Sequence, residues 1–139
     1  MYLLDTNVVS ELRRPRPHRG VLSWIRSVSP ERLHLSAVTV GEIQAGIEIT
    51  RERDAAKAAE LEDWLDEVLA SYSVLSMDAA AFRTWATLMH RRSDTEIQDA
   101  MIAAVAIDRG MTVVTRNARD FRPFGVRTLD PFAGRAANP

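Results

Sequence analysis

The segment from Ala100 to Ile107 constrains the fold most strongly, because all eight of its residues are apolar or alanine. A helix without a polar face has to be covered on every side. Gly110 stands where such a helix would end, and "MTVVT" follows as a short apolar strand. A buried helix that leads directly into a buried strand is typical of α/β domains, in which helices cover a sheet.

Strand-like and helix-like segments alternate along the rest of the chain. Further strands are predicted at 2–4, in "LHLSA", in "YSVLS" and in "VRTL", whereas "RNARDF" is predicted to be a loop. Because parallel strands need crossover helices, this alternation predicts a three-layer α/β/α fold with a mostly parallel central sheet. The expected helices run from an Asp5 or Thr6 cap to about Arg13, over 21–28, from a Ser36 or Thr39 cap through "VTVGEIQAGIEI", and over about 54–69, 79–92 and 96–109.

Length and composition limit the class of protein. The 139 residues are expected to form a single domain, with about 131–139 as a C-terminal tail. No apolar run approaches the roughly 18 residues of a membrane helix, and no secretory signal precedes the first strand, so we expect a cytoplasmic protein. The absence of cysteine excludes disulfides, a thiolate nucleophile and zinc held by sulfur.

Charge is distributed unevenly along the chain. The formal net charge of -1 argues against a protein that binds nucleic acid with its whole surface. The stretch 13–26 nevertheless contains five arginines and no acid. Such a run is commonly a solvated loop, but it is also a candidate RNA contact. The candidates are Arg13, Arg14, Arg16 and Arg19.

Four acidic residues are expected at the carboxyl edge of the sheet, where sites form in parallel α/β folds. Asp5 ends the first strand, and Asp120 follows "TVVT" closely enough to return to that edge. Glu42 and Asp99 are expected in the first turns of helices that begin there. Each residue alone would be an ordinary helix cap, first-turn charge or turn residue.

Four carboxylates within ~5 Å of one another would repel by ~3 kcal/mol per pair at an effective dielectric constant of 20. Shared protons, the nearby Arg116 and Arg119, or a divalent cation could compensate this repulsion. We favour the cation, because the neighbouring side chains supply neutral oxygen and no positive charge. An all-oxygen site of this kind suits Mg²⁺ or Mn²⁺. These neighbours are Thr6, Asn7, Thr115 and Asn117.

Other site chemistries fit the sequence less well. A phosphatase that forms an aspartyl-phosphate would need a second acid at position 7, where Asn7 cannot exchange the proton. "GEIQAG" lacks the Lys and Ser or Thr of a phosphate-binding loop, so Gly41 and Gly46 are interpreted as sites of close helix packing. The three histidines have neither zinc spacing nor a nucleophile elbow beside them.

Four stretches taken in order resemble the PIN-domain family, and within it the FitB-like branch of the VapC-type toxins. They are "LLDTNVVSEL", "SAVTVGEIQAGI", "DAMIAAVAIDRGMTVVTRNARDF" and "GVRTLDPF", which together span nearly the whole chain. The resemblance implies a PIN-like fold and a metal-dependent endoribonuclease of a type II toxin–antitoxin system. It implies that Mg²⁺ or Mn²⁺ activates a water that cuts RNA to leave a 5′-phosphate and a 3′-hydroxyl.

The resemblance also assigns roles to residues and implies partners. Asp5 and Asp99 match the principal metal ligands, and Glu42 and Asp120 would complete the site, partly through water. The implied partners are a second copy of the chain and a VapB-like antitoxin, which forms a hetero-oligomer with the toxin and inserts a basic side chain among the acids. The alternative from another class is a PIN-like module that binds RNA or protein without cutting. The polar residues Thr6, Thr115 and Asn117 match family positions that orient ligands or the scissile phosphate.

Overall fold

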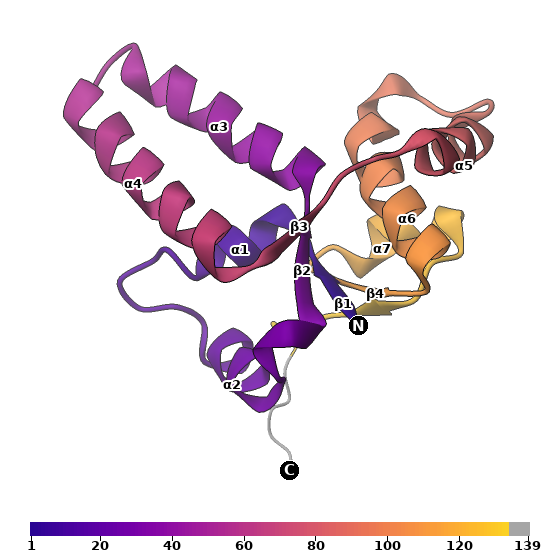
Figure 1. Cartoon of the computed structure of the whole chain (residues 1–139), viewed down its shortest axis with the longest axis horizontal. Coiled ribbons are helices and arrows are strands. Elements are labelled where there is room, and N and C mark those ends of the chain that lie inside the picture. Colours follow the sequence, from indigo (N-terminus) through magenta and orange to yellow (C-terminus); the bar gives the residue numbers. More distant parts are fainter. Residues whose placement is uncertain (134–139) are drawn as a thin grey trace.

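In the computed structural model, which describes residues 1–133, five short strands form one sheet and all neighbouring strands are parallel (Figure 1). The strand order is β3-β2-β1-β4-β5, so the first strand lies at the centre. This arrangement confirms the predicted parallel sheet. The strands are β1 (Tyr2–Leu4), β2 (Leu33–Ser36), β3 (Ser73–Leu75), β4 (Thr112–Val114) and β5 (Thr128–Leu129).

Helices cover both faces of this sheet (Figure 1). Single 3₁₀ turns occur at Pro30–Arg32, Asp94–Glu96 and Arg122–Phe124. In Figure 1, α3 and α4 form a hairpin on one side, while α5 and α6 lie on the other. The α-helices are α1 (Thr6–Glu11), α2 (Arg19–Ser27), α3 (Ala37–Arg51), α4 (Ala55–Ser71), α5 (Ala79–Met89), α6 (Ile97–Arg109) and α7 (Ala118–Phe121).

The central strand supplies the core of both layers, because successive side chains of a strand point to opposite faces. Leu3 is fully buried and belongs to the cluster that contains the α6 side chains and Val113. Leu4 is also fully buried, but it belongs to the cluster formed with α1, α2 and Val114. The three-layer α/β/α prediction is therefore confirmed.

Helix α6 is the buried helix that the apolar run predicts. Six of its residues are buried, and Gly110 ends the helix in the left-handed conformation with φ 65°. Ile107, the last residue of the run, is 39% exposed, so neighbouring elements bury the helix only as far as residue 106, about one turn before it ends. The small alanines of α6 let this helix pack closely against the sheet.

The α3–α4 hairpin carries a small core of its own, formed by Ile47, Ala58 and Leu65. The interpretation of Gly41 and Gly46 as sites of close helix packing is wrong. A Cβ atom at either glycine would meet nothing within 4 Å, because both lie on exposed positions of α3.

For α1 and α3 the structure selects one of the two predicted caps, and two other predictions near the carboxyl edge are wrong. Asp5 caps α1, and Thr6 is the first residue of that helix rather than its cap. Ser36, not Thr39, caps α3, so Glu42 lies in the second turn rather than the first. The segment "RNARDF" is not wholly a loop, because residues 118–121 form the single turn α7.

Within residues 1–133, no helix is long and apolar enough to cross a membrane. Most of the predicted C-terminal tail, residues 134–139, lies outside the described residues.

Candidate metal and RNA cleavage site

Asp5 is placed by the pairing of β1 with β4. Leu4 lies opposite Val114, and the Asp5 N–H continues the ladder by donating to the Val114 carbonyl at 2.9 Å. The Asp5 side chain consequently emerges beside the residue that follows β4, which is Thr115. Both side chains are buried, with Asp5 5% exposed and Thr115 0% exposed.

Neutral donors from the chain hold both oxygens of the Asp5 carboxylate. The Thr6 N–H donates to Oδ1 at 2.8 Å, while Thr115 Oγ1 and Asn7 Nδ2 donate to Oδ2 at 2.8 and 3.2 Å. Burial raises the pKa of Asp5, whereas these three hydrogen bonds oppose that rise. The nearby negative charge of Asp120 adds slightly to the raised pKa. Asp5 is thus fixed in one orientation.

Glu42 reaches the same place from α3. Thr6 Oγ1 donates to Glu42 Oε1 at 2.6 Å and lies 3.1 Å from the hydroxyl of the buried Thr39. Partial burial raises the pKa of Glu42, the Thr6 hydrogen bond lowers it, and the charge of Asp5 raises it further. Thr6 therefore links the two carboxylates through its own N–H and hydroxyl groups.

Asp99 lies in the first turn of α6, as predicted. Its pKa is raised from 3.8 to about 6, first by burial and then by the negative charges of its neighbours. Three of these neighbours are Asp5, Asp120 and Glu42, and Glu96 contributes the smallest effect. Asp120 itself is exposed and lies in α7. The four predicted acids are thus close enough to influence one another.

The four acids do not form a closed cluster. Within residues 1–133, no three His, Cys, Asp or Glu side chains are arranged so that they could hold a metal ion. The topology nevertheless brings the four acids to one edge of the sheet, where their charges affect the pKa of Asp99.

No arginine within residues 1–133 forms an ion pair with these acids. In the described part of the chain, the ion pairs involve Glu11, Glu48, Glu60, Glu62 and Glu96, and none of the four site acids. Arg116 instead stacks on the ring of Phe132, 3.8 Å from its centroid. Carboxylates that share a site without a cation beside them favour binding of a positive group from outside.

The supporting polar residues form a second layer around Asp5. The Asn117 N–H donates to Thr115 Oγ1 at 2.9 Å, and the Arg116 N–H donates to Asn7 Oδ1 at 3.1 Å. The first bond lies within the loop after β4, and the second binds that loop to the start of α1. The Asn7 amide donates to Asp5, so position 7 stabilises the carboxylate and does not serve as an acid.

The candidate RNA-binding arginines lie in and after the loop that follows α1. Glu11, which the sequence reasoning left without a role, anchors this loop. Its buried carboxylate accepts the His18 N–H at 2.8 Å and lies 3.6 Å from the guanidinium of Arg14. Arg16 and Arg19 are exposed.

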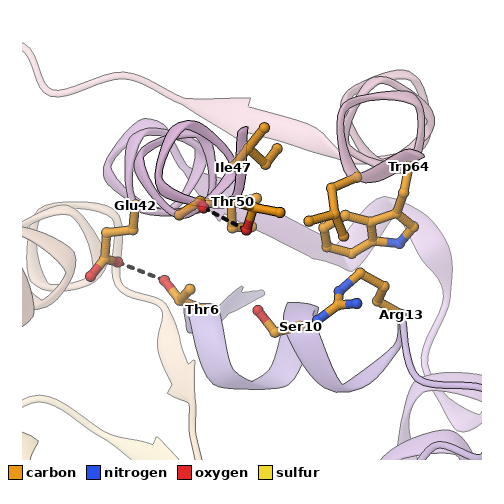
Figure 2. Close-up of a pocket in the computed structure, with 10 residues that line it drawn as sticks. Thr6, Ser10, Arg13, Glu42, Ile47, Thr50 and Trp64 are labelled. Atoms are coloured by element: carbon orange, nitrogen blue, oxygen red, sulfur yellow. Dashed lines mark hydrogen bonds between the residues drawn. The ribbon is translucent and has the colours of Figure 1, made fainter. Parts of the chain in front are cut away.

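A groove connects the acidic edge to this loop. It holds about 300 Å³ and lies between α1, α3 and α4. Figure 2 shows Glu42 and Thr6 at one end, with Arg13 and Trp64 at the other. Trp64 belongs to α4, and the sequence gives no sign of the groove, because three separate helices form its walls.

Fold and site together define an α/β protein with carboxylates gathered at the carboxyl edge of a parallel sheet. The chain belongs to the PIN-domain family, whose model matches residues 2–125. This match confirms the family predicted from the four sequence motifs.

Individual relatives match over nearly their full lengths. Plasmid stability protein StbB of Pseudomonas syringae pv. tomato is 37% identical, with 95% of this chain and 99% of the relative covered. VapC ribonuclease Y4jK of Sinorhizobium fredii is 36% identical, with 95% and 98% covered. Toxin FitB of Neisseria gonorrhoeae is 30% identical, with 95% and 99% covered. The crystal structure of FitAcB from that organism has a TM-score of 0.83 at 31% identity, with 95% and 99% covered.

Proposed function

We propose that this protein is the toxin of a type II toxin–antitoxin pair and that it acts as an Mg²⁺- or Mn²⁺-dependent endoribonuclease. The observation that carries the proposal is the group of acids at the strand edge, which lack a cation from the described chain. Two full-length relatives named as a VapC ribonuclease and a toxin support the same activity.

The donor set fits a hard divalent cation, since every candidate ligand is a carboxylate oxygen. Asp5 and Asp99 would hold the ion, and Glu42 and Asp120 would complete the site through water. This assignment agrees with the lack of a closed three-residue cluster, because Mg²⁺ usually keeps several waters. When bound, the ion would lower the pKa of a water and neutralise charge on the phosphodiester.

The remaining chemistry belongs to the chain. Asp5 presents its carboxylate in one orientation, because Thr6, Asn7 and Thr115 fix it from both sides. Thr6 also fixes Glu42 through its hydroxyl group. Carboxylates fixed in this way supply negative charge without first having to reorganise. Asp99, with its raised pKa, is ionised above about pH 6 and is protonated below it.

The same electrostatics suit an inhibitor. A VapB-like antitoxin that inserts an arginine or lysine among the acids would replace the cation and block the site. We expect the toxin to form a homodimer and to join the antitoxin in a hetero-oligomer in the cytoplasm.

Incubating the purified protein with total RNA in Mg²⁺ or Mn²⁺ tests the proposal. We expect discrete fragments with 5′-phosphate and 3′-hydroxyl ends, which disappear with EDTA and fall by ~100-fold or more in Asp99→Asn. Asp63→Asn removes an exposed acid on α4 and serves as the matched control. Identical fragments from the wild type and Asp99→Asn would refute the nuclease. RNA binding without any cleavage would favour the non-cutting binding module instead.

A further inference from the structure

The groove between α1, α3 and α4 begins at the proposed cleavage site. Thr6 and Glu42, which belong to the acidic edge, also line the groove (Figure 2). A molecule in the groove would therefore lie directly beside whatever the carboxylates act on. The volume of about 300 Å³ is at the lower end of the ~300–1,000 Å³ range of small-molecule sites. That size suits one ring system rather than a helix from a partner protein.

The far end of the groove has different chemistry from the acidic end. Trp64 and Arg13 lie there, and the guanidinium of Arg13 makes no ion pair within residues 1–133. Ile43, Ile47 and Leu61 supply apolar walls. Apolar walls with an aromatic ring and an arginine are the usual components of sites for single-stranded nucleic acid.

We propose that this groove binds one nucleotide of single-stranded RNA, next to the bond that is cut. The inference rests on the proposed ribonuclease function. The base lies between the apolar walls near Trp64, and a neighbouring phosphate faces Arg13. The charges support this placement of the nucleotide. Of the residues that line the groove, Glu42 is the acidic one and Arg13 is the basic one, and they lie at opposite ends. The strand then runs from the carboxylates toward the arginine.

Gly46 provides a way to fill the groove without disturbing the fold. It lines the groove, it is exposed, and a Cβ atom there would meet nothing within 4 Å. Gly41 is a matched control, since it is also exposed on α3 with open space at its Cβ but does not line the groove. Gly46→Leu and Gly41→Leu should both strengthen the helix, and to a similar extent. A difference between them therefore reports on the groove.

The test measures cleavage of a short RNA that spans a mapped cut, with one base at a time removed to leave an abasic site. For the wild type, we expect one RNA of this series, which lacks the base beside the cut, to be cleaved ~10-fold more slowly. The reason is that stacking of one base on an aromatic ring is worth ~1–3 kcal/mol. Gly46→Leu should cut intact RNA ~10-fold more slowly and should be insensitive to that abasic site. Gly41→Leu should behave as the wild type.

Binding gives a readout that does not depend on cleavage. Fluorescein-labelled RNA of the same sequence is titrated with Asp99→Asn in Mg²⁺ buffer, with and without Gly46→Leu. We expect Gly46→Leu to weaken binding by ~10-fold, also in a protein that does not cut. If no form of the protein cuts RNA but Gly46→Leu still weakens binding, the groove proposal survives the loss of the ribonuclease function.

Two results would overturn the groove proposal while leaving the ribonuclease intact. One is a Gly46→Leu protein that cleaves and binds RNA as the wild type does, with the same sensitivity to the abasic site. The other is unchanged cleavage together with loss of the co-expressed antitoxin on gel filtration, which would assign the groove to a protein partner.

Discussion

Asp5 and Asp99 share one edge of the sheet but are held in opposite ways. Asp5 follows a strand and accepts three hydrogen bonds from neutral donors of the chain. Asp99 lies on a helix, accepts no side-chain hydrogen bond from the described residues, and has a pKa raised to about 6. The comparison indicates that hydrogen bonds from the chain partly offset the cost of burying the Asp5 carboxylate, whereas the repulsion at Asp99 is left for an external cation to relieve.

Replacing each acid by its amide should change stability in opposite directions, and Asp5→Asn should give the largest effect. Its amide nitrogen would face at least one of the donors that now point at the carboxylate. We expect a loss of about 3 kcal/mol in the free energy of unfolding, measured by urea denaturation without metal. Asp99→Asn removes the repulsion and should not destabilise the protein. Equal losses in both variants would remove the distinction between the two sites.

Thr115→Val should give the next largest effect. It keeps the shape of the side chain but removes the donor to Asp5 and the acceptor of the Asn117 N–H. We expect a loss of about 2 kcal/mol by urea denaturation, together with slower RNA cleavage. Thr115→Ser keeps the hydroxyl and should restore most of the cleavage rate. A serine variant as slow as the valine variant would mean that packing, not the hydrogen bond, is what matters.

The pH dependence of stability should show the smallest effect. Because the folded-state pKa of Asp99 lies above its ordinary 3.8, the folded protein binds this proton more tightly than the unfolded chain. The resulting stabilisation is complete at low pH and is lost as the pH rises through about 6. Asp99 is half-buried, so solvent screening reduces the effect to about 1 kcal/mol.

The measurement compares urea denaturation of the metal-free wild type and Asp99→Asn between pH 4 and 7. The gap between the two should grow in favour of Asp99→Asn as the pH rises. A gap that stays constant with pH would show that Asp99 has an ordinary pKa. Adding Mg²⁺ at pH 7 should stabilise the wild type more than Asp99→Asn.

Sequence reasoning predicted the parts of the fold and site that topology dictates. The position of Asp5 follows from a three-residue apolar strand, and Gly110 marks the end of α6 because it takes a left-handed conformation. Glu42 was placed one turn too early, since both Ser36 and Thr39 are acceptable caps and only packing chooses between them. Helix α7 was missed because burial of Phe121 stabilises a single turn without any periodic pattern.

Distances at the site were beyond prediction for a different reason. The sequence specifies which strand or helix carries each acid, but the separation of the acids depends on how the helices tilt against the sheet. The groove beside Glu42 has the same origin, because its walls come from three helices that pack independently. Open space at Gly46 is likewise a property of the assembled hairpin.

The pairing of Leu4 with Val114 fixes the register between β1 and β4. It places a hydroxyl beside Asp5, and a shift of β4 by one residue would bring a valine methyl group there instead. A single-residue insertion in the turn before β4 would therefore inactivate the protein while leaving its acids unchanged. Loss of activity in a natural variant can therefore arise from a changed register between β1 and β4 as well as from substitution of the acids themselves.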